Sequence, residues 1–163
     1  MTGVQTCALP ICFPVTIWRI VCSCDTSVSV RDTDGVEIFN FDGGTGDGDM
    51  LDNWYIACSP VTAKFYLTQY GSDYVYIYDA DGTYISRFGG TGTGDGEFTT
   101  PYGLDVDDLD NVYVVDGTDG GDGRVQKFDN DGTYLLTFES LDLEYAETVV
   151  CGDNGYIYVI GLS

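Results

Sequence analysis

Five aspartates carry the metal-binding chemistry that this sequence could support. Asp116, Asp119 and Asp122 lie in one loop rich in Gly and Asp, and two other Gly-rich segments carry Asp47 and Asp95. Clustered carboxylate oxygens are the ligands that Ca²⁺ prefers. A Ca²⁺ site is therefore one interpretation, and a solvated turn is the other. We take the five aspartates as candidate binding-face residues and assign no catalytic residue, cofactor ligand or metal ligand.

Other chemistry is disfavoured by residue type and spacing. The chain has no His, which removes the usual general base near neutral pH and makes a zinc site improbable. The Gly clusters at 43–48 and 89–96 match neither nucleotide-binding pattern and place an Asp where an anion would bind. We expect them to be flexible links between structural units.

Two further motifs are interpreted as structural. The Asp-x-Asp-Gly segments have Val30, Ile77 and Lys127 where a calcium-binding EF-hand loop needs its first acid, and they lack the Glu at the twelfth position. Tyr66, Tyr113 and Tyr158 occupy equivalent positions in predicted strands, so core packing is expected of them rather than catalysis.

A threefold repeat indicates the elements that must position these residues. Val30–Gly35, Ile77–Gly82 and Lys127–Gly132 each contain an Asp-x-Asp-Gly turn and each lead to a Phe, with the turns 47 and 50 residues apart. This period is typical of the four-stranded blades of a propeller, about 40–50 residues each. Gly supplies the positive φ that the last position of a tight hairpin requires.

Alternating apolar residues between turn signals predict four strands in the best-preserved unit. These strands are expected at 102–106, 112–115, 124–128 and 134–138. The preceding unit is expected to have strands at 56–58, 65–67, 74–78 and 83–88, and an earlier one, lacking its first strand, at 20–24, 27–31 and 36–41. A last pair is predicted at 148–151 and 156–160.

The segments Phe98–Val106, Asn111–Asp116 and Arg124–Leu135 closely resemble an NHL repeat, the unit of a mostly six-bladed β-propeller family. The resemblance implies an all-β fold, a partial propeller of about three four-stranded antiparallel blades truncated from a six-bladed one. It places blades at about 15–45, 53–93 and 98–139 within a domain of residues 13–163, with another blade starting at 145–163. The lengthened loop 116–123 departs from the family pattern, and the blade at Asn53 lacks the Pro-x-Gly-Leu start.

Residues 1–11 resemble the translation of a sequencing-library adapter. We therefore set residues 1–12 aside and expect a metagenomic fragment whose true N-terminus is missing. The alternative, a weak signal peptide, lacks a basic start. An extracytoplasmic location is slightly favoured.

The net charge of −21 arises from 27 acidic and 6 basic residues. Such a chain is a poor partner for nucleic acid, whose binding depends on Lys and Arg. It has no apolar run of about 18 residues, so membrane insertion is not expected. The Asp excess suits a chain with many turns, or a high-salt environment. Cys22, Cys24, Cys58 and Cys151 are expected to be buried thiols.

Three functions remain open at this stage. Up-and-down strand order places the longer links at one end of the blades, where binding usually resides. We expect a non-enzymatic interaction module whose acidic loops bind a protein, a saccharide or a cation. One alternative is a lactonase-like or lyase-like enzyme with its catalytic residues in missing blades. The other is a structural protein that self-associates through open blade edges.

Overall fold

The computed structural model describes residues 18–22, 27–32, 34–42, 54–69, 71–117, 123–139 and 145–162. Within these ranges the chain is all β and contains no helix, so none of the described residues forms a helix that could span a membrane. The strands are β1 (Trp18–Cys22), β2 (Ser27–Asp32), β3 (Glu37–Asp42), β4 (Trp54–Cys58), β5 (Phe65–Gln69), β6 (Tyr74–Tyr78), β7 (Tyr84–Gly89), β8 (Pro101–Val106), β9 (Val112–Asp116), β10 (Arg124–Phe128), β11 (Tyr134–Phe138), β12 (Tyr145–Cys151) and β13 (Ile157–Leu162).

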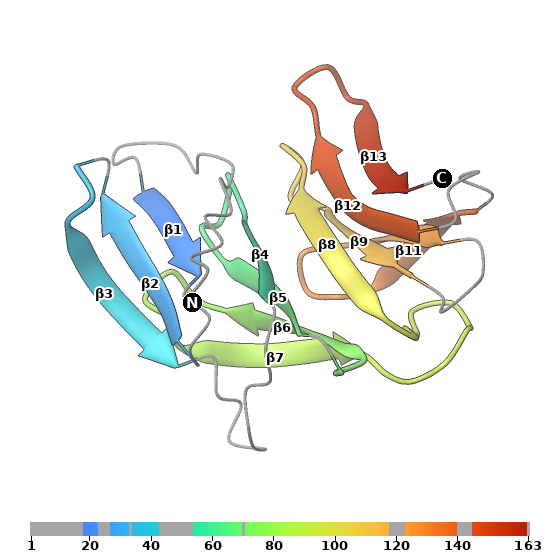
Figure 1. Ribbon diagram of the computed structural model, residues 1–163, viewed down its shortest axis with the longest axis horizontal. Helices are drawn as coiled ribbons and strands as arrows, with labels where there is room; N and C mark the ends of the chain where they lie inside the picture. The colour runs from blue at the N-terminus through green and yellow to red at the C-terminus, as the bar shows by residue number, and fades with distance from the viewer. Residues whose placement is uncertain are drawn as a thin grey trace.

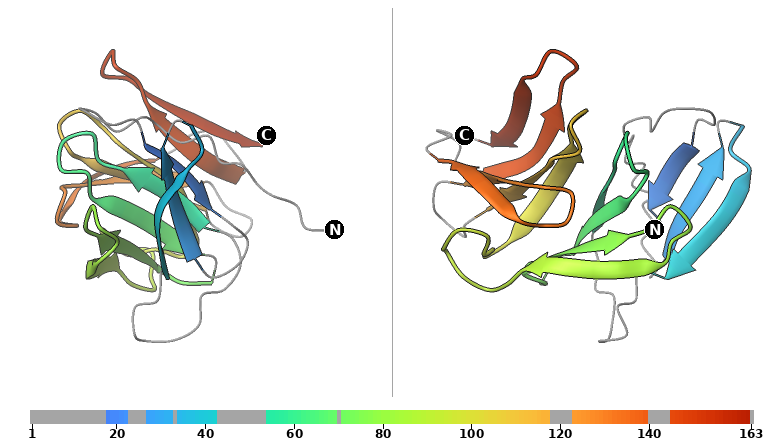
Figure 2. Two further views of the ribbon diagram at one scale, coloured as in Figure 1. Left: turned by 90° about the vertical axis from the view of Figure 1, so that its left-hand side faces the viewer. Right: turned by 180° about the vertical axis from the view of Figure 1, so that it is seen from behind.

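The strands form four antiparallel sheets in which each strand pairs with its neighbour in sequence. Two sheets are complete four-stranded meanders, β4–β7 and β8–β11, and they lie between a three-stranded sheet, β1–β3, and a two-stranded one, β12–β13. The sheets follow one another in a curved row, with β1–β3 at one end and β12–β13 at the other (Figures 1 and 2). The first strands of successive sheets are in contact, β4 with β8 and β8 with β12. This arrangement confirms the predicted partial propeller.

The repeated turn has the backbone geometry that its sequence predicts. Gly35, Gly82 and Gly132 have φ values of 82°, 82° and 89°. The N–H of Gly82 donates to the carbonyl of Asp79, and that of Gly132 donates to the carbonyl of Asp129. Only a residue without a side chain adopts this conformation at low cost.

Each of the three hairpins also carries the same irregularity beside its turn. The pairing register shifts between Val30 and Arg31, between Ile77 and Tyr78, and at the equivalent position of the third hairpin. An extra residue at this point increases the local twist of the strands. The three copies of the sequence repeat therefore share the same backbone geometry beside the turn.

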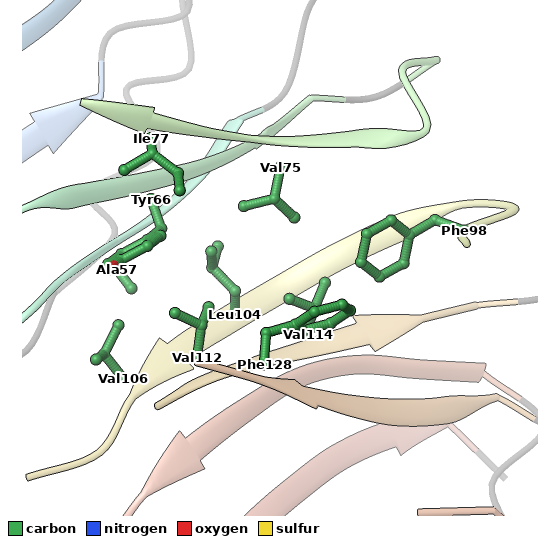
Figure 3. Close-up of a cluster of buried hydrophobic side chains, with 10 residues drawn as sticks. All are labelled: Ala57, Tyr66, Val75, Ile77, Phe98, Leu104, Val106, Val112, Val114 and Phe128. Atoms are coloured by element: carbon green, nitrogen blue, oxygen red, sulfur yellow. The ribbon is translucent and has the colours of Figure 1, made fainter. Parts of the chain in front are cut away.

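Apolar side chains fill the spaces between successive sheets. The largest of these clusters joins β4–β7 to β8–β11 (Figure 3) and is made of Ala57, Tyr66, Val75, Ile77, Phe98, Leu104, Val106, Val112, Val114 and Phe128. Smaller clusters join β1–β3 to β4–β7 and β8–β11 to β12–β13. Burial of apolar area between sheets, rather than within any one of them, is the main stabilising contribution of this architecture.

The prediction of core packing is correct for two of the three equivalent tyrosines. Tyr66 and Tyr113 are 0% and 7% exposed, whereas Tyr158 is 52% exposed. Tyr158 differs because its face of the last hairpin is not covered by any described sheet. The prediction for this residue was therefore wrong in this chain.

The cysteines also require one correction. Cys151 is a half-buried free thiol, as expected, but Cys58 is disulfide-bonded. Its partner is a cysteine whose side chain lies outside the described part of the chain. Sequence spacing did not indicate this bond.

Candidate binding face

The link 89–100 forms one end of the two complete sheets, together with the end of β9 and the start of β10. We call this region the link face. Phe98, which is fully buried, anchors the link in the cluster between the sheets. Its ring centroid lies 5.5 Å from that of Phe128 and 6.3 Å from that of Phe88. The link is thus attached to the core through Phe98.

A buried ion pair holds the two sides of the link. The Asp116 carboxylate is fully buried, Arg124 Nε donates to its Oδ2 at 3.0 Å, and Arg124 Nη2 lies 3.0 Å from the same oxygen. Asp116 Oδ1 accepts hydrogen bonds from the backbone N–H groups of Thr99 and Thr100, both at 2.9 Å, and from Thr99 Oγ1 at 3.3 Å. The carboxylate of Asp116 is therefore surrounded by donors.

Arg124 extends this contact to the tip of the link. Its Nη1 donates to the carbonyl of Thr93 at 2.9 Å, and its Nη2 donates to the carbonyls of Gly94 and Glu97 at 3.2 and 2.8 Å. The planar guanidinium can satisfy several acceptors in fixed directions. One side chain of β10 therefore fixes three separate carbonyl groups of the link.

Gln126, two residues along β10, makes a second attachment. Its Nε2 donates to the carbonyl of Glu97 at 2.7 Å, and its Oε1 accepts the N–H of Gly96 at 2.9 Å. Gln126 is fully buried, so both bonds form away from water, where an unsatisfied amide would be costly.

The link is further shaped by close approaches that only glycine allows. A Cβ on Gly92 would lie 2.0 Å from the Glu97 carboxylate, and one on Gly89 would lie 2.6 Å from the Phe98 ring. The backbone of Gly90 pairs with Asp73 on one side and with Phe98 on the other. The expectation of a flexible link is therefore wrong for 89–96, whose glycines permit compact packing. The cluster at 43–48 lies outside the described residues.

The structure places two of the five candidate aspartates. Asp95 is exposed on the link, and Asp116 is buried beneath it in the ion pair. Asp47, Asp119 and Asp122 lie outside the described residues. Within the described part of the chain, no group of three or more acidic, Cys or His side chains could hold a metal ion. The Ca²⁺ site stays a prediction.

The opposite end of the sheets, which we call the turn face, comprises the turns 59–64, 107–111 and 129–132. Ser59 is fully buried and donates to Asp110 Oδ1, while Asn130 Nδ2 donates to Asp110 Oδ2 at 2.8 Å. The Tyr66 hydroxyl donates to the Asn130 carbonyl at 3.0 Å. These bonds join the turns of two neighbouring sheets.

Asp107 organises the turn within its own sheet. Its carboxylate accepts hydrogen bonds from the N–H groups of Leu109 and Asn111, the Asn111 side chain and the Tyr113 hydroxyl. Partial burial alone would raise the pKa of Asp107, but these hydrogen bonds, led by those of Asn111, outweigh burial and lower it.

Nucleophiles at the turn end of the sheets are in unreactive surroundings. Burial, reinforced by the neighbouring Asp105 carboxylate, raises the pKa of the Cys151 thiol well above its usual range. Asp105 itself is buried, which raises its pKa, and its Oδ2 accepts the N–H of Cys151 at 2.7 Å. A thiol with a raised pKa has little of the reactive thiolate form.

Arg124 and Gln126 are the residues of this site that sequence reasoning missed. A signal was present for Arg124, because Asp116 and Arg124 are paired residues in the register of β9 and β10. Extending the predicted strand 112–115 by one residue would have placed these opposite charges across from each other. No comparable signal existed for Gln126, whose partners belong to a different sheet connection.

Comparison with known proteins agrees with this architecture. Residues 60–161 match the model of a family described as "6-bladed beta-propeller". The chain belongs to this family. No curated protein sequence matches the chain.

Several solved structures share the propeller fold. A structural genomics protein of unknown function from Bacteroides thetaiotaomicron is 20% identical, with a TM-score of 0.64 over 89% of this chain and 42% of that one. A streptogramin B lyase is 14% identical, with a TM-score of 0.62 over 98% and 49%. A chain of the nidogen/laminin complex is 18% identical, with a TM-score of 0.58 over 87% and 50%.

At these identities the likeness concerns the fold alone. The chain spans about half the length of the solved structures that it matches. One of the three structures is a lyase, one belongs to a protein complex and one has no known function. The shared fold therefore does not indicate one function.

Proposed function

We propose that this chain is part of an NHL-type propeller that acts as a non-enzymatic interaction module, with the link face as its binding surface. The observation that carries the proposal is the buried Asp116–Arg124 pair, which holds the link 89–100 in one conformation. A loop fixed by a rigid scaffold loses little conformational entropy when it binds a partner.

The charge of the link face indicates the chemistry of its partner. All basic side chains that the structure describes already contact an acidic group or a ring: Arg31, Lys64, Arg124 and Lys127 in ion pairs and Arg87 over the Tyr74 ring. Asp95 and Glu97 remain exposed on the link. A cationic protein surface, a saccharide rich in hydroxyl donors, or a cation such as Ca²⁺ would suit such a surface.

One neighbour supports protein binding and another supports an enzyme. The nidogen/laminin structure contains this fold in a protein complex, which is compatible with an interaction module. The streptogramin B lyase is the reason to keep a second candidate, a propeller enzyme whose catalytic groups lie in the remaining blades. The buried Ser59 and the raised pKa of Cys151 favour the interaction module for the part described here.

Hydrogen exchange of the purified chain with three separate probes tests the proposal: CaCl₂, a lysine-rich peptide and a neutral oligosaccharide. We expect at least one probe to slow amide exchange within residues 89–97. Asp95→Asn should weaken that protection several-fold, whereas Asp153→Asn, the same charge change on the last hairpin, should leave it unchanged.

Three outcomes would count against the interaction module. The first is an absence of protection with all probes, and the second is an equal loss in the two variants. The third is turnover of a lactone or ester by this chain that a substitution in it abolishes. MgCl₂ and NaCl at matched ionic strength separate Ca²⁺ binding from general screening of the acidic surface.

A further inference from the structure

Two neighbouring turns of the turn face carry large apolar side chains at their tips. Leu109 is 81% exposed and Val61 is 61% exposed. Each turn joins the first and second strands of a complete sheet, β8 to β9 and β4 to β5. Both turns extend from the ends of the strands, so a blade packed against the face of a sheet would leave these tips uncovered. We call Val61 and Leu109 the turn-face pair.

Both turns also contain a residue in a backbone conformation that favours glycine. Ala63 and Asp110 have φ values of 58° and 67°, and no other non-glycine residue in the described part of the chain has a positive φ. Each lies two residues before the next strand, where the turn of the last hairpin has Gly155 with a φ of 78°. Strained backbone of this kind is concentrated at functional sites, where the surrounding structure maintains it.

Buried hydrogen bonds hold the two turns against each other. Ser59 and Asn130 each donate to one carboxylate oxygen of Asp110. Ser59 Oγ also accepts the N–H groups of Val61 and Thr62 at 3.1 and 2.8 Å. Ser59 and Asp110 are 0% and 6% exposed. The backbone beside both exposed tips is therefore fixed, and a partner would lose little free energy in ordering it.

The surroundings of the turn-face pair are acidic. Asp108, next to Leu109, is exposed, and the side chain of Asp131 is 80% exposed. The nearby Lys64 ammonium already forms an ion pair with Asp131 at 3.0 Å. The surface therefore combines an apolar centre with a charged rim, the arrangement that is common in protein interfaces.

We propose that the turn-face pair binds a protein segment with an apolar side chain flanked by Lys or Arg. The apolar side chain lies against Val61 and Leu109, and the basic groups lie beside Asp108 and Asp131. Charge complementarity favours this occupant over a second copy of the chain, whose own acidic turns would be repelled. It also disfavours an anionic membrane surface. The link face is at the opposite end of the sheets, so this proposal does not rest on the proposed function.

A library of random peptides displayed on phage is the probe for this surface. The library is first depleted on the double variant Val61→Ser/Leu109→Ser and then selected on the wild-type chain. Depletion removes peptides that bind any other surface, the link face included. We expect the surviving peptides to share an apolar residue with Lys or Arg beside it. Their binding should weaken as NaCl increases, because salt screens the contacts with Asp108 and Asp131.

Fluorescence anisotropy of a surviving peptide with single variants locates the contact. Val61→Ser and Leu109→Ser should each raise the Kd at least fivefold, and Asp108→Asn should raise it about twofold or more. Leu136→Ser should leave the Kd unchanged, because Leu136 is 41% exposed in the middle of β11, away from both tips. All four side chains are exposed, so the variants should keep the wild-type circular dichroism spectrum.

Three results would overturn the proposal. The first is that no peptide survives the depletion step. The second is an equal loss of binding in Leu109→Ser and Leu136→Ser. The third is a set of surviving peptides without basic residues, which would exclude the cationic partner. None of these results would change the outcome of hydrogen exchange at residues 89–97, so the two proposals fail separately.

Discussion

At the scale of single residues, the Asp116–Arg124 pair has a structural role that its exposed counterparts do not share. Asp116 is fully buried and receives four hydrogen bonds from Thr99, Thr100 and Arg124. The Arg31–Glu37 pair is exposed to solvent. Removal of one partner from a buried pair leaves an uncompensated charge, whereas an exposed pair contributes little.

Arg124→Ala should therefore lower the free energy of unfolding by about 3–5 kcal/mol. The matched change Arg31→Ala should lower it by less than about 1 kcal/mol. Urea denaturation of both variants gives the comparison. Equal effects would mean that the buried pair does not stabilise the link face.

The pKa of Asp107 predicts a specific dependence of stability on pH. A carboxyl whose pKa is lower in the folded state stabilises the fold above its unfolded value of about 3.9, and this stabilisation is lost as pH falls through the folded-state pKa. Wild type should therefore be more stable than Asp107→Asn at pH 6, and the difference should shrink below about pH 4.

Asp108→Asn provides the control for this experiment, because Asp108 lies in the same turn but is exposed. Its effect on the free energy of unfolding at pH 6 should be much smaller than that of Asp107→Asn. A constant difference for Asp107→Asn as well would show that its hydrogen bonds do not favour the ionised form.

At the scale of elements, replacing a glycine of the repeated hairpin turn lowers the free energy of unfolding in two ways, through backbone strain and through collision of the new side chain. Gly35 and Gly132 both have positive φ, at 82° and 89°. A Cβ on Gly35 would meet nothing within 4 Å, but one on Gly132 would lie 2.5 Å from the Phe88 ring. The first site reports backbone strain alone, and the second adds a collision with the core.

Gly35→Ala should cost about 1–2 kcal/mol of unfolding free energy, the penalty of the left-handed conformation. Gly132→Ala should cost about 1–3 kcal/mol more, because the Phe88 ring must move. Thermal or urea unfolding measures both. A smaller loss for Gly132→Ala than for Gly35→Ala would contradict the packing of the turn against Phe88.

The elements themselves were largely predictable from the sequence, because each depends on local patterns. The Asp-x-Asp-Gly turns and the alternation of Arg124–Phe128 predicted the hairpins that are observed. Contacts between distant segments were not predictable in this way. The attachment of Gln126 to the link depends on how the sheets stack.

The candidate site was predicted only in part, for a related reason. Asp95 and Asp116 lie at the same end of the sheets, since strand order alternates the loops between two ends. The burial of Asp116 was missed because it was taken as a loop residue, whereas it ends β9 opposite Arg124. Because β9 is one residue longer than predicted, Asp116 is the partner of Arg124 rather than a free loop carboxylate.

At the scale of the whole molecule, the sheets and the link face are mutually dependent. Phe98 belongs both to the core between two sheets and to the link, so the position of the link follows from the stacking of the sheets. The row of sheets ends in an apolar face at β12–β13 and in a polar face at β2–β3. The described part of the chain therefore carries an acidic surface that its own sheet packing holds in place.

The binding face requires that Asp116 and Arg124 hold the link 89–100 in a single conformation. Native-state hydrogen exchange measured residue by residue tests it directly. We expect the amides of Gly96, Thr99 and Thr100 to be protected in the wild-type chain and to exchange at least tenfold faster in Arg124→Ala, while amides of β5 keep most of their protection. Unprotected amides at these three positions in the wild-type chain would contradict the claim.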